Sequence, residues 1–390
     1  MSIKLKVVLG VLASMALSAL GNVRLAAWLR REDVEAAARQ ALRTAAESYA
    51  DLEQADVEKL SAVLEGVSAD PSLAKAFLRR DRPRLLELAG PVFAALRERH
   101  GVTHWYFHDP EPSRTCFLRV HAPALHGDVI QRPTFEAAVA RQATASGTEL
   151  GRTAFALRVV RPWTRGGKLI GYLELGEEID HFLRRMRRQT GDEFAMLVLK
   201  ERLDEKAWTA TRGAARNTWG DRADVVVVNS TADERLLGWQ GRVQDLPEGG
   251  RVLGLDRGGD RAFVRGAVPL ADATGARVGA LLVLHDVTAL DRGLQDHYRG
   301  VSVVVLAIAL GASVLLVLLL ERLVFRRLER LMARMEDLGA RVAGGDYDVA
   351  PDAPPPSGDE IGRLEEFFAR FLRVVGGALS DLQRRQGRDG

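Results

Sequence analysis

The sequence predicts an α+β protein that carries two membrane-spanning helices and a helical module at its C-terminal end. Three observations support this fold class: uncharged apolar runs at residues 300–320 and 7–23, helical periodicity before residue 100, and strand-like alternation after it. About 20 consecutive apolar residues are enough for a helix to cross the hydrocarbon core of a bilayer. We therefore expect a large part of the chain on one side of a membrane and a small part on the other.

The N-terminal apolar run, residues 7–23, follows a short cytoplasmic start, residues 1–6, with Lys4 and Lys6. It is short for a span, and its Ala-Leu-Ser-Ala stretch also resembles the end of a cleavable signal peptide. We expect an uncleaved anchor, because the apolar run passes into a helical pattern at Leu25 and Leu29 without a proline or an obvious turn.

The charges that flank residues 300–320 predict how the chain crosses the membrane. Two arginines, Arg292 and Arg299, precede this run, whereas five follow it: Arg322, Arg326, Arg327, Arg330 and Arg334. The positive-inside rule then places the C-terminal part in the cytoplasm. Residues 24–299 are expected outside the cytoplasmic (inner) membrane of a bacterium.

The charge and the cysteine content indicate whether the chain binds nucleic acid and whether it forms disulfide bonds. The formal net charge is +3 with acidic and basic residues interspersed, so no nucleic-acid partner is predicted. The single cysteine, Cys116, excludes an internal disulfide, and its apolar neighbours Phe117 and Leu118 favour a buried neutral thiol.

Residues 24–100 are predicted to be helical. Leu42, Ala45, Tyr49 and Leu52 recur at spacings of three and four, as one face of an amphipathic helix requires. The sequence Asp70-Pro71-Ser72 predicts a helix break and restart, and Gly101 predicts the end of the helical region.

Four runs after Gly101 alternate as strands of a half-buried sheet do, at residues 103–108, 114–121, 153–161 and 169–175. Each has an apolar face and a face that mixes polar, charged and aromatic side chains. On the mixed faces we placed His104, Tyr106 and His108 of the first run; Thr115, Phe117, Arg119 and His121 of the second; Ala154, Ala156 and Arg158 of the third; and Tyr172 and Glu174 of the fourth. Gly171 leaves a gap on the apolar side.

The mixed faces predict either a solvated sheet surface, which antiparallel sheets commonly have, or the lining of a ligand pocket. Guanidinium groups beside flat aromatic walls suit a small anion or carboxylate. The predicted ligand-binding residues are Tyr106, His108, Arg119, His121, Arg158, Trp163, Tyr172 and Glu174. We expect no metal, haem or other cofactor, because His104 and His108 on one strand would lie roughly 13 Å apart.

The segments 104–130, 149–163 and 167–183 together resemble the membrane-distal module of double-Cache sensor domains, and most closely double Cache domain 3. These are extracytoplasmic ligand-binding regions of bacterial chemoreceptors, sensor kinases and diguanylate cyclases. The resemblance continues more weakly through 191–208, 223–231 and 277–290. It implies two stacked PAS-like (Cache) sheets after a long N-terminal helix, a distal module at 101–189 that holds the ligand, and a proximal module at 190–299.

A shorter similarity is rejected. Gly191-Asp-Glu-Phe194 resembles the active-site signature of diguanylate cyclases, but Thr190 replaces the first glycine and the expected location lies outside the nucleotide pool of the cell.

After the second apolar run, the apolar residues Leu328, Leu331, Met335, Leu338 and Val342 are spaced as in a coiled coil, and so are Ile361, Leu364, Phe368, Phe371 and Val375. Residues 321–378 resemble a HAMP domain, with Gly345-Asp346 and Asp359-Glu360-Ile361-Gly362 as its motifs. Arg327 in place of the usual proline and a proline-rich connector depart from that family, and two generic amphipathic helices are the alternative. The resemblance implies a parallel homodimer.

The tail, residues 379–390, is too short for a kinase, a cyclase or a methyl-accepting hairpin, and no nucleophile or phosphate-binding motif is found elsewhere. We therefore expect no enzyme. The prediction is a transmembrane receptor for an extracytoplasmic small molecule that signals through HAMP to a kinase, cyclase or chemotaxis partner in trans. A membrane-anchored binding or scaffold protein, or a fragment of a longer receptor, is the alternative.

Overall fold

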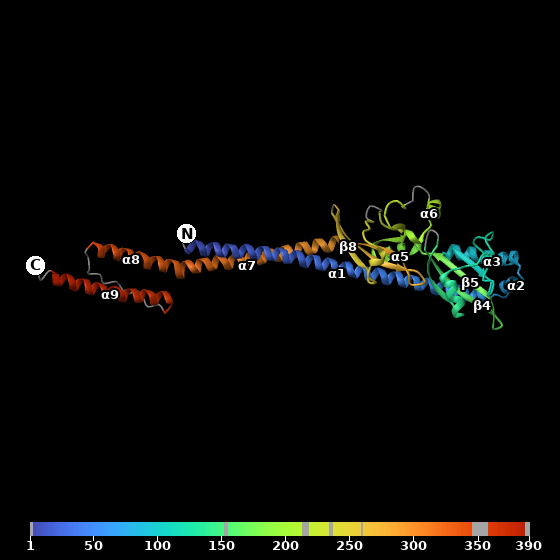
Figure 1. The fold of residues 1–390 in the computed structure, drawn as a ribbon, viewed down its shortest axis with the longest axis horizontal. Coiled ribbons are helices and arrows are strands. Elements are labelled where there is room, and N and C mark those ends of the chain that lie inside the picture. The colour runs from blue at the N-terminus through green and yellow to red at the C-terminus, as the bar shows by residue number, and fades with distance from the viewer. Residues whose placement is uncertain are drawn as a thin grey trace. The chain divides into compact units, whose positions relative to one another are not determined.

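The computed structural model describes residues 3–151, 155–212, 218–233, 237–258, 260–344 and 358–386. The chain forms two compact units. One is Arg31–Gly293, and the other combines Met1–Arg30 with Leu294–Gly390. Figure 1 shows the ribbon with its elements labelled.

Three helices precede the first strand; the break at Asp70 is predicted by the sequence, whereas the second break, between Leu78 and Arg82, is not. Helix α1 spans Ile3–Ala69 without a break, α2 spans Pro71–Leu78 and α3 spans Arg82–His100. The Asp70 carboxylate accepts hydrogen bonds from the backbone N–H groups of Ser72 and Leu73, which caps α2. Gly101 ends α3 in the left-handed conformation that glycine adopts without strain.

The first sheet is antiparallel and has the strand order β2-β1-β5-β4-β3. Its elements along the chain are β1 (His104–His108), β2 (Cys116–Arg119), α4 (Pro133–Arg141), β3 (Ala145–Leu150), β4 (Phe155–Arg165) and β5 (Lys168–Glu178). The four predicted strands are confirmed. The edge strand β3 was not predicted, because its sequence Ala-Ser-Gly-Thr-Glu-Leu lacks an apolar alternation.

The second sheet repeats this topology, with the order β7-β6-β10-β9-β8. Its elements are α5 (Asp180–Thr190), β6 (Glu193–Leu199), a 3-10 turn at Lys200–Arg202, α6 (Glu205–Arg212), β7 (Val225–Ser230), a 3-10 turn at Val243–Asp245, β8 (Arg251–Gly258), β9 (Arg261–Ala271) and β10 (Arg277–Asp286). Asp192 lies immediately before β6 and Phe194 within it, so the strand predicted at residues 194–199 is confirmed.

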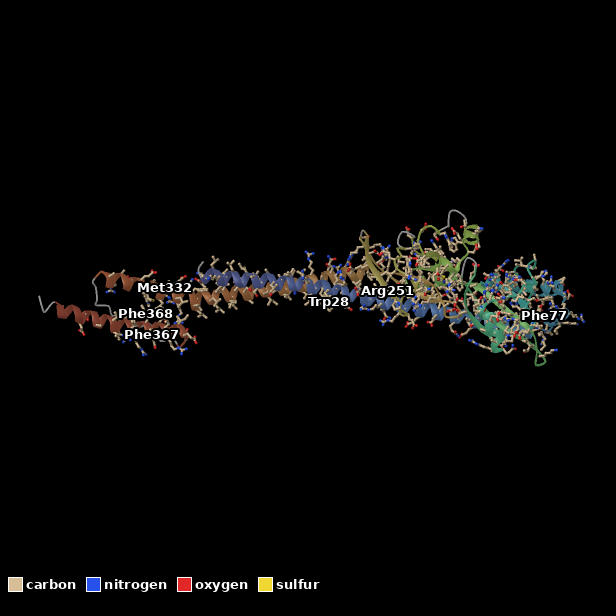
Figure 2. All side chains as sticks on the ribbon, viewed as in Figure 1. Trp28, Phe77, Arg251, Met332, Phe367 and Phe368 are labelled. Atoms are coloured by element: carbon tan, nitrogen blue, oxygen red, sulfur yellow. The ribbon has the colours of Figure 1, made fainter. Side chains whose placement is uncertain are left out.

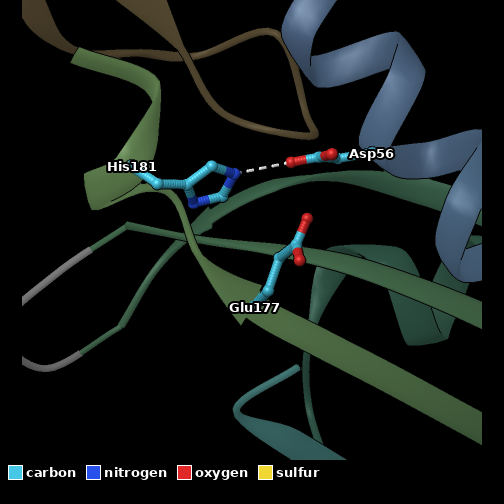
Figure 3. A group of neighbouring side chains, drawn as sticks. All are labelled: Asp56, Glu177 and His181. Atoms are coloured by element: carbon cyan, nitrogen blue, oxygen red, sulfur yellow. Dashed lines mark hydrogen bonds and ion pairs between the residues drawn. The ribbon is translucent and has the colours of Figure 1, made fainter. Parts of the chain in front are cut away.

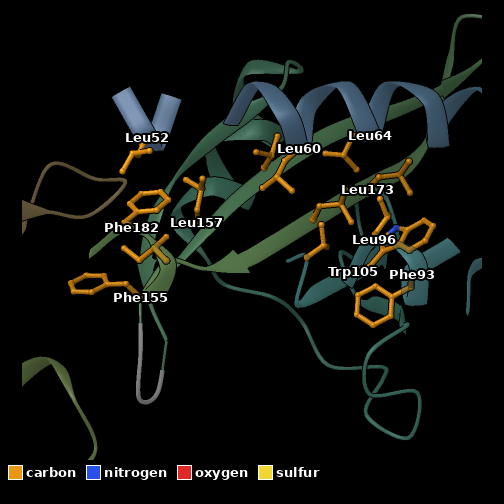
Figure 4. Close-up of a cluster of buried hydrophobic side chains, with 14 of the residues drawn as sticks. Leu52, Leu60, Leu64, Phe93, Leu96, Trp105, Phe155, Leu157, Leu173 and Phe182 are labelled. Atoms are coloured by element: carbon orange, nitrogen blue, oxygen red, sulfur yellow. The ribbon is translucent and has the colours of Figure 1, made fainter. Parts of the chain in front are cut away.

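The apolar faces of both sheets share one continuous core with the N-terminal helices. Leu60 and Leu64 of α1 face Leu173 of β5, and the same cluster includes Phe155 and Phe182 (Figure 4). It extends into the second sheet through side chains such as Phe194, Met196, Val226 and Val283. The two modules are therefore packed through a common interior rather than joined only by a linker.

Side-chain alternation is predicted correctly except at two irregular positions. A register shift after Phe107 places Cys116 on the mixed face and Phe117 in the apolar core, the reverse of the expectation. A second shift after Trp163 turns Leu169 toward the mixed face. Such bulges reverse the phase of a strand, which no periodicity analysis detects.

The gap at Gly171 is filled from outside the sheet. A Cβ atom at this position would lie 3.0 Å from the Phe77 ring and 2.5 Å from the His108 carbonyl oxygen. Phe77 of α2 in turn packs edge-on against Phe117, with 5.2 Å between ring centroids. The missing side chain thus lets α2 approach the sheet closely.

The mixed face of the first sheet is not a solvated surface. Helix α4 and the segment before it cover this face, and a second apolar cluster joins Tyr106, Cys116 and Tyr172 to Ile130 and Phe135. The Cys116 thiol is buried and free, and burial raises its pKa to about 12, so the neutral-thiol prediction is confirmed.

The other unit contains two helices that are long and apolar enough to cross a membrane, namely the start of α1 and α7, which spans Thr288–Leu320. The most apolar window of each is unburied, so their leucines, isoleucines and valines face outward. A helix that is apolar all round requires an apolar environment. Lys4 and Glu321 form an ion pair, with 2.7 Å between Nζ and Oε2.

Beyond α7, a π-helical turn (Glu321–Phe325) leads into α8 (Arg326–Ala343), and α9 spans Glu360–Gln386. Arg327 pairs with Asp359 at 2.6 Å and with Glu365 at 3.1 Å, so it joins the start of α8 to the start of α9. The Gly345-Asp346 motif, the proline-rich connector, the side chains of Leu338 and Val342, and residues 387–390 of the tail lie outside what the structure describes, as does Ala154.

Candidate functional site

A cavity of about 730 Å³ opens on the mixed face of the first sheet and reaches the second module. The sheet supplies His104 and Tyr106 of β1, Ala156 and Arg158 of β4 and Glu178 of β5, while the second module supplies Arg202, Asp204, Asp272 and Val278. The rest of the lining is Gln131, Arg132 and Pro133 before and at the start of α4, with Glu149, Leu150 and Gly151 at the end of β3. Both modules therefore contribute side chains to one candidate ligand site.

Glu174 organises the floor of this cavity. Its carboxylate is fully buried and accepts hydrogen bonds from Arg132 at 2.6 Å, from Arg158 at 2.7 Å and from His108 Nε2 at 2.9 Å. Burial alone would raise the pKa of Glu174, but the His108 hydrogen bond and the two guanidinium charges lower it well below its usual range. Glu174 is therefore an internal anion that holds two arginines in place.

A second carboxylate, Glu149, ties Arg158 to the start of α4. Glu149 Oε2 lies 3.2 Å from Arg158 Nε, and its Oε1 accepts hydrogen bonds from the backbone N–H (2.8 Å) and hydroxyl (2.6 Å) of Thr134. A negative group at a helix N-terminus also interacts favourably with the positive end of the helix dipole. Arg158 is thus neutralised by two carboxylates before any ligand arrives.

The Tyr106 ring is the aromatic surface around which the cations gather. Arg132 lies 4.8 Å from the ring centroid and donates a hydrogen bond to the phenol oxygen at 3.2 Å. Arg119 and Arg158 lie 5.7 and 5.8 Å from the same centroid. Cation–π contacts of this kind fix the planes of guanidinium groups.

Two histidines beside Tyr106 are held neutral. Burial, the charge of Arg158 and the proximity of His121 lower the pKa of His104 to about 3. Burial lowers the pKa of His121 to about 4, and its Nδ1 accepts a hydrogen bond from the Trp105 backbone N–H at 3.2 Å, which requires this nitrogen to be unprotonated. At neutral pH both rings therefore act as polar, uncharged walls.

The eight predicted ligand residues occupy different places. Tyr106 and Arg158 line the cavity, and His108 and Glu174 lie directly beneath it. Tyr172 is buried in the apolar cluster under α4, where its hydroxyl accepts a hydrogen bond from Gln142 at 2.9 Å. His121 contacts Tyr106 at the edge of this group.

Two placements correct the expectation. Trp163 lies on the opposite face of the sheet, in the main core, and its indole N–H donates to the Ser68 carbonyl at 2.9 Å. Arg119 and Arg158 do not converge as free cations, because Arg119 pairs with Asp128 at 2.6 and 2.7 Å. The guanidinium groups had been assigned by strand face alone, which does not reveal their internal carboxylate partners.

Sequence reasoning missed the cavity residues that lie outside the four predicted strands. Arg132 and Gln131 precede α4, and Pro133 at the first position of that helix was a usable signal of a helix start. Arg202, Asp204 and Asp272 come from turns of the second module, and no local pattern connects them to the first sheet.

A family model describing the double sensory domain of two-component sensor kinase, dCache_3, matches residues 35–290. The chain belongs to this double-Cache family. No curated protein sequence matches it. The family membership confirms the double-Cache resemblance and identifies the two sheets as the two modules of one sensor region.

Several solved sensor domains are distantly similar to this chain. The periplasmic domain of Vibrio cholerae LuxQ is 12% identical, with 63% of this chain and 98% of that chain covered and a TM-score of 0.37. The sensor domain of the V. cholerae histidine kinase DctB is 15% identical, with coverage of 63% and 98% and a TM-score of 0.37. The sensory domain of the Campylobacter jejuni chemoreceptor Tlp3 with isoleucine bound is 11% identical, with coverage of 66% and 94% and a TM-score of 0.40.

The lowered pKa of His104 predicts acid sensitivity of the sensor region. Between pH 6.5 and about 3 the unfolded chain binds a proton at His104 that the folded chain does not, so the free energy of unfolding falls as pH falls through this window. At pH 5 this amounts to about 1–2 kcal/mol. Between pH 7 and pH 5, His104→Asn should lose less stability than the wild type in denaturant titrations.

His100→Asn, at the exposed end of α3, is the matched control and should keep the pH dependence of the wild type. Equal pH dependence in His104→Asn and the wild type would show that His104 is not held neutral by the fold.

Proposed function

We propose that this protein is a transmembrane receptor that binds an extracytoplasmic small molecule in the cavity described above. One observation carries the proposal: a single cavity takes side chains from both modules of a double-Cache sensor region. A ligand that contacts both modules can favour one of their arrangements over another, which is the requirement for a population shift. We propose no catalytic role for the chain itself.

The charges of the lining suggest the class of ligand. Arg132, Arg158 and Arg202 lie in the same cavity as Glu149, Glu178, Asp204 and Asp272, and Tyr106 supplies a flat apolar wall. We expect a small polar molecule whose anionic group faces Arg132 or Arg202. A hydrogen-bond donor or cationic group on the same molecule would face Asp204 and Asp272.

The signal would leave the sensor region through α7. In this proposal α7 and the start of α1 cross the membrane, and α8 and α9 form a cytoplasmic HAMP module in a homodimer. A small displacement of α7 would change the packing of α8 and α9, and a kinase, cyclase or chemotaxis protein would read it in trans.

Filling the cavity should abolish ligand binding without unfolding the protein. Ala156 is buried in the cavity lining, so Ala156→Phe would occupy space that a ligand needs. A small molecule found by thermal-shift screening of the full chain in detergent should bind at least tenfold more weakly to this variant in calorimetry, a loss of about 1.4 kcal/mol.

Arg119→Ala is the control, because Arg119 pairs with Asp128 and is not in the cavity lining. It should keep most of the affinity. Equal binding by Ala156→Phe and the wild type would place the ligand elsewhere. If binding is confirmed but the output of a co-expressed partner never responds, the alternative of a binding or scaffold protein is favoured.

The proposed topology predicts the location of two reporters. A reporter fused after Gly390 should be active only in the cytoplasm, and one inserted near Glu248 only outside it, because the arginines after Leu320 favour the cytoplasmic side. Activity of both reporters on the same side of the membrane would contradict the two-span topology.

The proposed homodimer predicts a contact through α9. Phe367, which is labelled on α9 in Figure 2, is exposed in the single chain. Phe371 and Val374 are also exposed, whereas Ala369 is buried. Phe371→Glu should weaken disulfide crosslinking between copies that carry Gly377→Cys, because burying a phenylalanine contributes about 1.5–3 kcal/mol. The exposed neighbour Arg370→Glu should have little effect. Unchanged crosslinking in Phe371→Glu would argue against this interface.

A further inference from the structure

A second polar group lies on the opposite side of β5 from the cavity, where α1, β5 and α5 meet. It consists of Asp56 of α1, Glu177 of β5 and His181 of α5 (Figure 3). Each residue offers one atom that could bind a metal ion, and these three atoms all lie within 4.8 Å of one another. Asp56 and Glu177 are buried, although neither carboxylate contributes to the cavity described above.

The hydrogen bonds of His181 orient one ring nitrogen as a ligand. Nδ1 lies 3.1 Å from the Glu178 carbonyl oxygen, which can only accept, so Nδ1 carries the proton and donates it there. In the neutral ring Nε2 then has a lone pair, and it points at Asp56 Oδ2 at 2.7 Å. At this distance only a proton fits between the two acceptors, and a metal ion would replace that proton with the two atoms moved apart to roughly 3.3 Å. Histidines that bind metals characteristically donate their other N–H to a carbonyl or carboxylate in this way.

Glu177 provides a second observation, independent of His181, that points to a cation at this site. Its side chain is 0% exposed, and no donor among the residues that the structure describes reaches Oε1. Burial and the neighbouring Asp56 carboxylate raise the pKa of Glu177 to about 7, so either a proton shared with Asp56 or a metal ion can satisfy this oxygen. Figure 3 shows its carboxylate directed toward Asp56. A buried carboxylate oxygen without a partner is costly, and coordination to a cation removes that cost.

Lys59 occupies the place of such a cation in the present arrangement. Its ammonium lies 2.7 Å from Glu177 Oε2 and 3.1 Å from Asp56 Oδ1. The Lys59 side chain is 28% exposed, so it can turn into solvent when a divalent ion enters. Arg185 Nη1 also lies 3.8 Å from Asp56 Oδ1, and its side chain is 42% exposed, so it too can turn into solvent. With both cations withdrawn, two carboxylates and a neutral imidazole balance a 2+ charge.

We propose that Asp56, Glu177 and His181 form a Zn²⁺ site that pins α1 to β5 and α5. One nitrogen and two oxygen ligands suit Zn²⁺, whereas Ca²⁺ takes six to eight oxygen ligands and Mg²⁺ demands octahedral oxygen coordination. Tetrahedral ligands about 2 Å from the ion lie roughly 3.3 Å apart, so only small side-chain shifts are needed. An adjoining cavity of about 500 Å³, lined by Asp56 and His181 among others, gives water and the ion access to the fourth position.

The site connects the helix from the first apolar segment to the strand that carries Glu174. Glu177 and Glu174 are three residues apart on β5. An ion held between α1 and Glu177 would therefore restrain the strand that forms the floor of the ligand cavity. The proposal depends on these residues alone and not on the proposed receptor function.

The test uses the full chain in detergent, purified through a tag without histidine, stripped with a chelator and dialysed. Titration with ZnCl₂ in a calorimeter, with the metal content measured by mass spectrometry, should give one ion per chain, and CaCl₂ and MgCl₂ should give none. His181→Ala and the isosteric Glu177→Gln should each weaken Zn²⁺ binding by about 100-fold or more, since even outer partners of ligands contribute 10–100-fold.

Two further variants separate a metal site from an internal ion-pair network. Lys59→Met should bind Zn²⁺ more tightly than the wild type, because it removes the competing cation. His100→Ala removes a histidine that lines the same adjoining cavity but lies outside the triad, and it should bind normally. A wild-type chain without bound Zn²⁺, or equal binding by His181→Ala and His100→Ala, would overturn the proposal and leave Lys59 as the cation.

Discussion

The buried charge of Glu174 is the constraint on which the candidate site depends. A carboxylate removed from water is tolerated only when positive or hydrogen-bonding groups surround it, and here His108, Arg132 and Arg158 do so. Because these partners come from β1, the approach to α4, and β4, satisfying one charge fixes three elements relative to β5. The positions of the arginines are therefore determined before a ligand arrives.

This arrangement limits the interactions that the arginines can make with a ligand. Arginines already paired with Glu174 and Glu149 offer their remaining N–H groups rather than an unopposed charge, so recognition depends on geometry more than on net attraction. The carboxylates of the second module add opposite charges at the other end of the cavity. A ligand with two complementary groups is favoured over a simple anion.

The continuous apolar core also fixes the elements around the cavity before a ligand arrives. Side chains of α1, both sheets and α5 belong to one cluster, so displacement at the floor of the cavity is resisted by close-packed neighbours in both modules. The polar group around Asp56 lies within the stretch of α1 that this cluster includes, between Leu52 and Leu60. In the proposed function, coupling between the cavity and the helices α1 and α7 then requires rearrangement of packed elements, which favours discrete states over gradual bending.

The sequence determined what depends on local pattern. Periodicity of three and four specified the helices, the Asp70-Pro71 break and the Gly101 end are local backbone chemistry, and alternation specified four of the five strands of the first sheet. Alternation also predicted correctly that Tyr106, Arg158 and Glu174 share a face. The double-Cache resemblance is confirmed by the family match over residues 35–290.

Only the tertiary structure decided which charges meet. Arg119 and Arg158 lie on the predicted face, but their partners Asp128 and Glu149 come from segments without periodicity. Bulges placed Cys116 and Leu169 on unexpected faces, and Trp163 belongs to the core. The cavity residues of the second module and the Asp56–Glu177–His181 group unite segments more than a hundred residues apart. Periodicity reports which side of an element is apolar, whereas ion pairs and cavities depend on which distant elements the folded chain brings into contact.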